Sequence, residues 1–394
     1  MKMWIYIIRR AVLLVPIVIG VMTITFVLVN SLPWQDQMEA HFGCTPHACN
    51  YSTGTALYNR SVIALGLNQP VYVRWAIYMG NALSFNWGSV SAHSSVGKSV
   101  VGSSFIGVPV TTVFADLLPY TIELAALSLL IILIISIPLG NLSAVYRNRP
   151  IDQASRVMSF SGYALPGFLL GSLVLIAVVL VIGPATHYQS VTPWCPSGET
   201  TYLEFFGSWP TTTCFANGVY PAWLGSAGVH STPTGFPTID AVIHGQYWLA
   251  LDTIIRIILP ALVIAFGTIA TLLRFVRNSM LEVMNLDFVR TARAKGVPES
   301  TVISRHAGRN SLNVTVTVLG LTFAFFLGGF PIIETVFNLN GIGYILAIAV
   351  DNVQYPFDFA VIFGSVILFT YLVVVANLIV DILYAYLDPR VRLG

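Results

Sequence analysis

Six long stretches of this chain contain almost no charged residues, and they constrain its fold more than any other feature. A helix needs about 20 apolar residues to cross the roughly 30 Å hydrocarbon core of a bilayer. Charged residues make up only 9% of the chain, against about 25% in ordinary soluble domains. The sequence therefore predicts an all-α polytopic membrane protein with six transmembrane helices, over residues 11–32, 119–143, 157–183, 254–275, 313–333 and 358–380.

The basic residues predict how these spans are oriented. Fifteen of the 19 Lys and Arg residues fall in the N-terminal segment, in the loops after spans two and four, and in the C-terminal tail. Cytoplasmic loops carry such an excess, so both termini are predicted to be cytoplasmic, in a cell (plasma) membrane. No small-residue cleavage site follows the first apolar run. We therefore interpret residues 1–32 as a retained anchor helix.

Two long segments, 33–116 and 184–252, are predicted to lie outside the membrane on the other side. Apolar spacing over 68–79 predicts a helix on the membrane surface within the first of them. Four thiols allow three pairings, and the two local pairs are the simplest because each closes a loop inside one segment. A metal site is the weaker alternative, since no Cys-x-x-Cys spacing occurs. The disulfide candidates are Cys44 with Cys49 and Cys195 with Cys214.

The chain lacks the groups that would let it supply its own energy. No span carries an ionisable residue near its centre, whereas proton- and ion-coupled carriers usually need one there. The sequence has no Walker A motif, no His-Glu-x-x-His and no Gly-x-Ser-x-Gly with triad candidates. We expect no catalytic residue, cofactor or metal site in this chain, so a partner must supply the energy. A secondary carrier or channel is the alternative.

The loop at 276–312, between spans four and five, has the pattern of two helices joined by a tight turn. Good helix formers fill most of 287–295, and an acid begins the segment, as the helix dipole prefers. Gly296 followed by Pro298 is a helix stop, after which a second helix is predicted to run into span five. A basic loop that faces only lipid headgroups is the alternative.

The helical repeat assigns faces to the first of these two helices. Phe288 and Ala292 are predicted to share one face, and Arg290 and Arg293 another. Small side chains would let another surface approach closely at Thr291, Ala292 and Ala294. The candidate docking residues are Asp287, Arg290, Thr291, Ala292, Arg293, Lys295 and Gly296.

Short motifs are spread along nearly the whole chain. They include Leu67-Asn-Gln-Pro70, Leu165-Pro-Gly-Phe168, Thr291-Ala-Arg-Ala-Lys-Gly296, Arg305-His-Ala-Gly-Arg-Asn310, Glu334-Thr-Val-Phe337, Gly341-Ile-Gly343 and Leu387-Asp-Pro-Arg-Val-Arg392. Together they resemble the inner-membrane permeases of the dipeptide/oligopeptide branch of ABC importers. The resemblance implies a type I permease bundle in which residues 117–394 form a five-helix core.

The resemblance also implies partners and a role for the basic loop. Arg290, Thr291, Ala292 and Gly296 would occupy the places of the family's "EAA" motif, whose short coupling helix sits in a cleft of the ATPase. Gly308 and Val314 depart from the family pattern, which expects a larger aliphatic residue and a proline. The implied partners are a second, homologous permease, two ABC ATPases that bind ATP and Mg²⁺, an extracytoplasmic solute-binding protein and membrane lipid, with no nucleic acid. Di- and oligopeptides are the implied substrates, with oligosaccharides or nickel as alternatives.

Without ionisable groups in mid-membrane, a substrate path must be lined by neutral residues. Thr315, Thr322 and Gly329 recur at intervals of seven in the predicted fifth span, which places them on roughly one helical face. We predict that this face, with Asn313, borders the translocation pathway. Helix-to-helix packing, which often uses such small residues in membranes, is the alternative.

Overall fold

The structure, a computed structural model, describes most of the predicted membrane core. The residues described are 3–33, 65–90, 107–182, 234–245, 247–326, 328–337, 341–350 and 357–387, with the single residues 37, 59, 62, 63, 96 and 339. Within them the regular elements are helices, apart from one isolated bridge between Ser89 and Pro109. The predicted all-α class is confirmed for these residues.

Four helices among the described residues are long and apolar enough to cross a membrane. They are α1 (Met3–Asn30), α6 (Val110–Val145), α12 (Tyr247–Met284) and α18 (Phe359–Leu387). The helices α7 (Pro150–Ala164) and α8 (Gly167–Ile182) would add a fifth span if the pair is counted as one. The predicted count of six spans is therefore not confirmed.

The continuous third span predicted over 157–183 is wrong. The axes of α7 and α8 meet at 103°, and Leu165 between them has an extended backbone (φ −98°, ψ 114°). The cause is Pro166, because a proline lacks an N–H group and its ring pushes the preceding residue out of the helical region.

The predicted fifth span also ends early. The helix α15 (Arg309–Phe326) stops before Gly329, whose φ of +80° is left-handed, and Pro331 then begins the short helix α16 (Pro331–Val336). After α16 comes α17 (Ile342–Val350). Gly329 therefore does not continue the helical face of Thr315 and Thr322, and the predicted single face is wrong. That these residues border the pathway stays a prediction.

The centre of the bundle is the contact between α6 and α12, which α7, α15 and α16 extend. Small residues let the helices approach closely, as is common in membrane proteins. A Cβ atom at Gly140 of α6 would lie only 2.7 Å from the Val276 side chain of α12. The short helix α11 (Pro237–Ile243) joins this centre through Glu123 of α6, whose carboxylate accepts a hydrogen bond from the Thr238 N–H at 3.0 Å.

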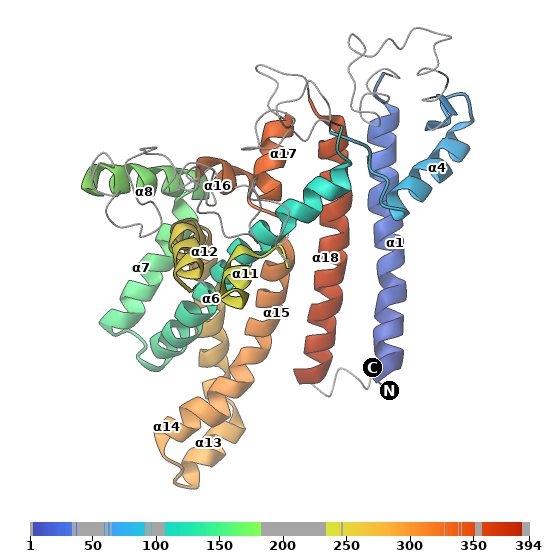
Figure 1. The fold of residues 1–394 in the computed structure, drawn as a ribbon. Coiled ribbons are helices and arrows are strands. Elements are labelled where there is room, and N and C mark those ends of the chain that lie inside the picture. Colours follow the sequence, from blue (N-terminus) through green and yellow to red (C-terminus); the bar gives the residue numbers. More distant parts are fainter. Residues whose placement is uncertain are drawn as a thin grey trace.

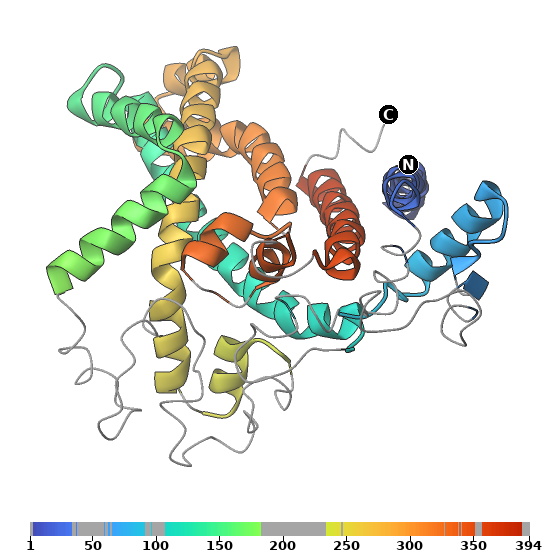
Figure 2. The same ribbon diagram turned by 90° about the horizontal axis from the view of Figure 1, so that it is seen from above.

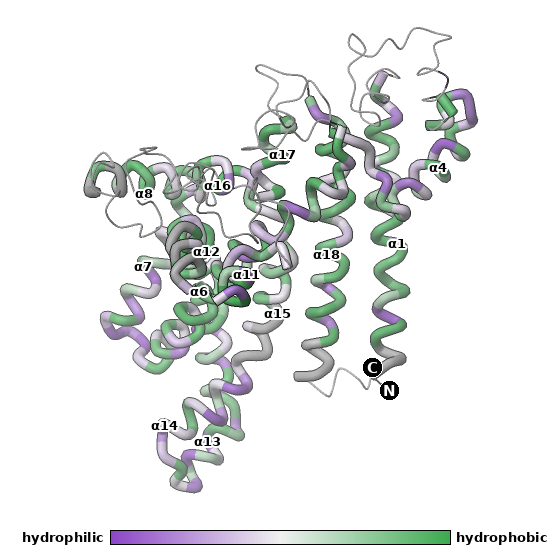
Figure 3. Tube along the Cα trace, viewed as in Figure 1, coloured by the Kyte–Doolittle hydropathy of each residue, from purple (hydrophilic) through white to green (hydrophobic). Residues whose placement is uncertain are grey.

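A peripheral layer is formed by α1, α18 and α4 (Val71–Leu83). Figure 2 shows α1 and α18 side by side, and the Arg10 guanidinium lies 3.5 Å from the Asp381 carboxylate. The helix predicted over 68–79 is present as α4, and Trp75 donates a hydrogen bond to Thr23 of α1 at 3.1 Å. Hydrophobic residues dominate α1 and α18 in Figure 3.

One end of the molecule collects the segments that the sequence predicts to be cytoplasmic. The start of α1, the turn between α6 and α7, and the last described turn of α18 lie in the lower part of Figure 1. The short helices α13 (Asp287–Ala294) and α14 (Glu299–Thr301) project below them, and Figure 3 colours many of their residues hydrophilic. This arrangement makes the α13–α14 end the natural place to look for a contact with a soluble partner.

Candidate functional site

The two helices joined by a tight turn that were predicted for the basic loop are confirmed. Helix α13 ends at Ala294, and Gly296 follows with φ +74°. The Gly296 N–H donates to the Arg293 carbonyl at 3.0 Å and the Val297 N–H to the Ala292 carbonyl at 3.2 Å. These two bonds form the Schellman cap, which needs a left-handed residue and therefore favours glycine. A side chain at Gly296 would meet no atom within 4 Å, so only the backbone conformation restricts this position.

The inner face of α13 is apolar and packs against the ends of two long helices. Val289 (0% exposed) and Ala292 (8%) join a buried cluster with Ala144 of α6 and with Met280 and Val283 of α12. The prediction that Ala292 is open to a partner is therefore wrong. Local periodicity could not decide this, because the buried face of a short helix depends on what it packs against.

The outer face of α13 is exposed. Phe288 is 41% exposed and thus does not share a buried face with Ala292. Thr291 and Lys295 are also exposed, and their spacing from Phe288 places the three on one side of the helix. Thr291, at least, keeps the accessibility that the sequence predicted.

Charged side chains stiffen the turn between α13 and α14. The guanidinium of Arg293 donates hydrogen bonds to the Glu299 carboxylate, from Nη2 to Oε1 at 2.7 Å and from Nε to Oε2 at 3.1 Å and Oε1 at 3.3 Å. These hydrogen bonds hold the pKa of Glu299 below its usual range and raise the pKa of Arg293. The Arg290–Asp287 pair is longer, at 3.6 Å, with both side chains largely exposed, so it contributes little.

The second helix of the loop does not enter α15 as a regular α-helix. Residues Val302–Gly308 form a π-helix between α14 and α15. A Cβ atom at Gly308 would lie 3.0 Å from the Ile303 carbonyl oxygen, so the wider turn leaves little room for the larger aliphatic residue expected there. After the π-helix, the Ser279 hydroxyl of α12 donates to the Ser311 carbonyl of α15 at 3.0 Å. Short π-helical turns often occur at functional sites.

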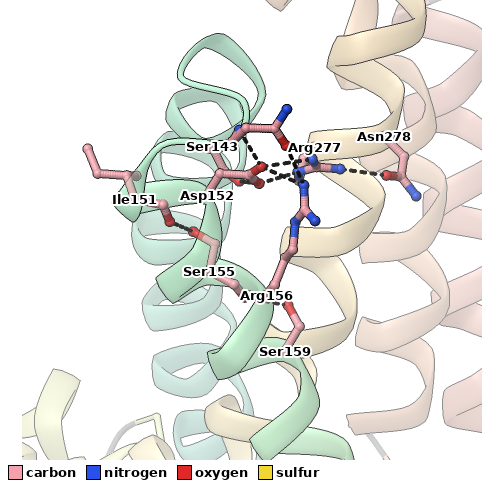
Figure 4. A network of polar contacts seen from close by, with 9 residues as sticks. Ser143, Ile151, Asp152, Ser155, Arg156, Ser159, Arg277 and Asn278 are labelled. Carbon is pink, nitrogen blue, oxygen red and sulfur yellow. Dashed lines mark hydrogen bonds and ion pairs between the residues drawn. The ribbon is translucent and has the colours of Figure 1, made fainter.

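A buried ion pair lies behind this loop, and the sequence reasoning missed it (Figure 4). The Asp152 carboxylate is 0% exposed and receives the Arg277 guanidinium through bonds of 2.6 Å and 3.1 Å. Ser143, the Asn148 N–H and Arg156 donate to it at 2.8, 2.9 and 2.7 Å. One carboxylate thus joins the end of α6, the start of α7 and the last third of α12.

Part of this network could have been found from the sequence. Pro150 followed by Asp152 is the pattern of a helix start, with proline in the first turn and an acid near the N-terminus. Arg156 stands four residues later, at the spacing of a helical ion pair. The contact with Arg277 spans 125 residues of sequence, and no local pattern indicates it.

A second buried carboxylate explains one of the family-like motifs. Glu334 of α16 is 0% exposed and accepts hydrogen bonds from the Tyr344 N–H at 2.8 Å and from the Phe330 N–H at 3.2 Å. A Cβ atom at Gly343 would lie 2.9 Å from the Glu334 carboxylate. The Glu-Thr-Val-Phe and Gly-Ile-Gly stretches therefore fold against each other, because the glycines leave room for the carboxylate.

The remaining predicted site residues have different outcomes. Thr315 is completely buried, and the Thr322 hydroxyl donates to the Val318 carbonyl of its own helix at 2.8 Å. Asn313 belongs to α15, but its side chain lies outside the described part. The cysteines also lie outside it, so the disulfides remain a prediction. The described residues contain no group of three or more His, Cys, Asp or Glu side chains that could hold a metal ion.

Comparisons with known proteins identify the relatives of this chain. Residues 136–393 match the family described as "Binding-protein-dependent transport system inner membrane component". The oligopeptide transport system permease protein AppB of Bacillus subtilis is 31% identical over 98% of this chain and 99% of its own. The probable D,D-dipeptide transport system permease protein DdpB of Escherichia coli is 32% identical over 100% and 99%. The di/tripeptide transport system permease protein DppB of Pseudomonas aeruginosa is 29% identical over 98% of both chains.

Proposed function

Because the chain belongs to the family of binding-protein-dependent transport system inner membrane components, we propose that it is the membrane-spanning permease subunit of an ATP-driven importer of di- and oligopeptides. The names of the three relatives support peptides as the substrate, since each refers to oligopeptides, dipeptides or tripeptides. None of the three refers to an oligosaccharide or to nickel. The resemblance inferred from the motifs agrees with this membership.

The observation that carries the coupling role is the two-sided character of α13. Its inner side, Val289 and Ala292, is fixed to the ends of α6 and α12, and its outer side is free for a partner. We assign the outer stripe of Phe288, Thr291 and Lys295 to the contact with an ABC ATPase. A partly exposed aromatic ring flanked by a small and a basic residue suits a cleft that is apolar at its base and acidic at its rim.

The remaining partners follow from the same proposal. ATP and Mg²⁺ bind to two ATPase subunits on the side of α13, which is the cytoplasmic side. A second, homologous permease completes the pathway, and a solute-binding protein delivers the peptide from the opposite side. When the ATPases close on ATP, they displace α13, and the buried contacts pass this displacement to α6 and α12. The bundle then turns from inward-facing to outward-facing.

Reconstitution of the complete importer tests this proposal. The two permeases, the ATPases and the binding protein are placed in proteoliposomes, and ATP hydrolysis is measured with di- to pentapeptides, with an oligosaccharide or with Ni²⁺. We expect peptides alone to stimulate hydrolysis and to accumulate in the compartment on the ATPase side. Stimulation by the sugar or the metal instead would overturn the substrate assignment. Peptide movement without any ATPase would overturn the importer assignment.

A further inference from the structure

A small cavity lies between α1, α4 and α18, near the end of α1 opposite its N-terminus and far from α13 (Figure 1). Its volume is about 90 Å³. About 10–15 Å³ of such space is enough for one water molecule, so the cavity has room for a phosphate-sized group.

Three of the residues that line this cavity carry polar atoms without partners. Asn30 Oδ1, Arg74 Nε and the Tyr78 hydroxyl are buried and make no hydrogen bond within the structure. The Arg74 side chain does donate to neutral Gln37, from Nη2 to Oε1 at 2.7 Å. Among the described residues no carboxylate pairs with Arg74.

These unsatisfied atoms define the chemistry of a ligand. An unpaired polar atom costs about 1–3 kcal/mol when it is buried, and an unpaired charge costs more. The Arg74 Nε–H and the Tyr78 hydroxyl need acceptors, and a guanidinium binds phosphate particularly well. The Asn30 oxygen needs a donor. A negatively charged phosphodiester that carries a hydroxyl group meets all three requirements.

The walls of the cavity are largely apolar and adjoin exposed apolar side chains. Aromatic rings of Phe26, Trp87 and Phe363 line it. Two apolar residues at its edge are exposed: Val27, one helical turn before Asn30 on α1, at 58%, and Val71, one turn before Arg74 on α4, at 56%, as expected of side chains in contact with acyl chains. A ligand in this place would therefore have a polar head inside and an apolar body outside.

We propose that this cavity binds the headgroup of an anionic phospholipid from the membrane leaflet opposite α13. The phosphate lies against Arg74 and Tyr78, a headgroup hydroxyl donates to Asn30, and the acyl chains run along α1. The lipid holds the peripheral helices α1 and α4 against α18, where their direct polar contacts are few.

Lipid retention by the purified full chain tests the proposal. The protein is washed in detergent and its bound phosphatidylglycerol is counted by native mass spectrometry. We expect about one retained molecule in the wild type, and at least a tenfold faster loss in Arg74→Gln and in Asn81→Trp, which fills the cavity. Tyr78→Phe keeps the ring packed against Phe26, with centroids 5.6 Å apart, and removes only the hydroxyl. Faster loss of lipid from this variant would therefore result from the missing hydroxyl and not from misfolding of the site.

Controls separate this site from other sources of binding. Arg149→Gln removes an exposed cation near α7 and should leave retention unchanged, because that residue is not part of the cavity. Phosphatidylglycerol nanodiscs should raise the Tm of the wild type above its value in phosphatidylcholine, and Arg74→Gln should abolish the difference. Equal retention in all variants would overturn the proposal, as would an equal rise in Tm from free inorganic phosphate.

Discussion

Replacing Gly296 by valine tests the coupling role through backbone conformation alone. Gly296 has φ +74°, and a new side chain would meet no atom within 4 Å. The substitution therefore causes no collision, and its cost is the strain of a left-handed L-residue. That cost is roughly 1–2 kcal/mol for residues with a Cβ atom and largest for β-branched ones.

The strain translates into a measurable change in coupling. A cost of one to two kcal/mol lowers the population of the correctly capped loop by about 5- to 30-fold relative to its alternatives. Since only the capped loop presents α13 to the ATPase, peptide-stimulated ATP hydrolysis should fall, by up to this factor. Asparagine tolerates left-handed backbone far better than valine, so Gly296→Asn should keep most of the stimulation.

Gly245 supplies a matched control, because its φ is +71° and a Cβ atom there would also meet no atom within 4 Å. It follows α11, away from the loop. Gly245→Val therefore imposes similar strain without touching the contact with the ATPase. Hydrolysis is measured in proteoliposomes at equal amounts of inserted protein. Full stimulation in Gly296→Val, or equal losses at both positions, would refute the coupling argument.

Three further predictions concern the loop and its support. Asp152→Ala leaves the Arg277 side chain, which is 14% exposed, without its partner and should destabilise the bundle by about 3–5 kcal/mol. Arg156→Ala breaks only a half-exposed contact and should cost under about 1 kcal/mol. Both free energies are measured by detergent unfolding, and equal losses would contradict this prediction. Thr291→Trp should weaken ATPase binding while preserving the Tm, whereas Ala292→Trp overpacks the inner cluster and should lower the Tm; the reverse pattern would exclude the proposed docking face. Because the pKa of Glu299 lies below its ordinary 4.5, the stabilisation from the Arg293 pair is present above pH 4.5 and is lost as the pH falls through the folded-state pKa. Amide exchange at 293–299, corrected for its intrinsic rate, should therefore rise only in acid. Glu299→Gln should remove this pH-dependent rise.

The parts of the loop that the sequence predicts correctly depend on local chemistry. A glycine, followed two residues later by proline, ends one helix and begins another whatever surrounds it, and the Schellman cap at Gly296 follows from this. The side of α13 that is buried is different. Ala292 is at helical spacing both from Val289 and from Phe288, so the sequence allows either pair to be buried. The positions of α6 and α12 determine that Val289 is the buried one.

The errors in the spans have a similar physical origin. Hydropathy averaged over a window measures the length of an apolar stretch, but it does not show where the chain changes direction. Residues 157–183 look like one span by this measure, while the backbone turns through 103° at Leu165 and Pro166. In the same way the stretch 313–333 hides the left-handed Gly329 and the new helix at Pro331.

The contacts around α12 indicate which helices would move when α13 is displaced. Arg277, which holds α6 and α7 through Asp152, stands three residues before Met280, which packs against α13 in the buried cluster. A helical turn is short and stiff, so a displacement at Met280 cannot bypass Arg277. We infer that α6, α7 and α12 move as one body. Helix α15 is joined to α13 through a π-helical segment, whose wider turns are easier to rearrange, so it is the element best placed to shift relative to that body.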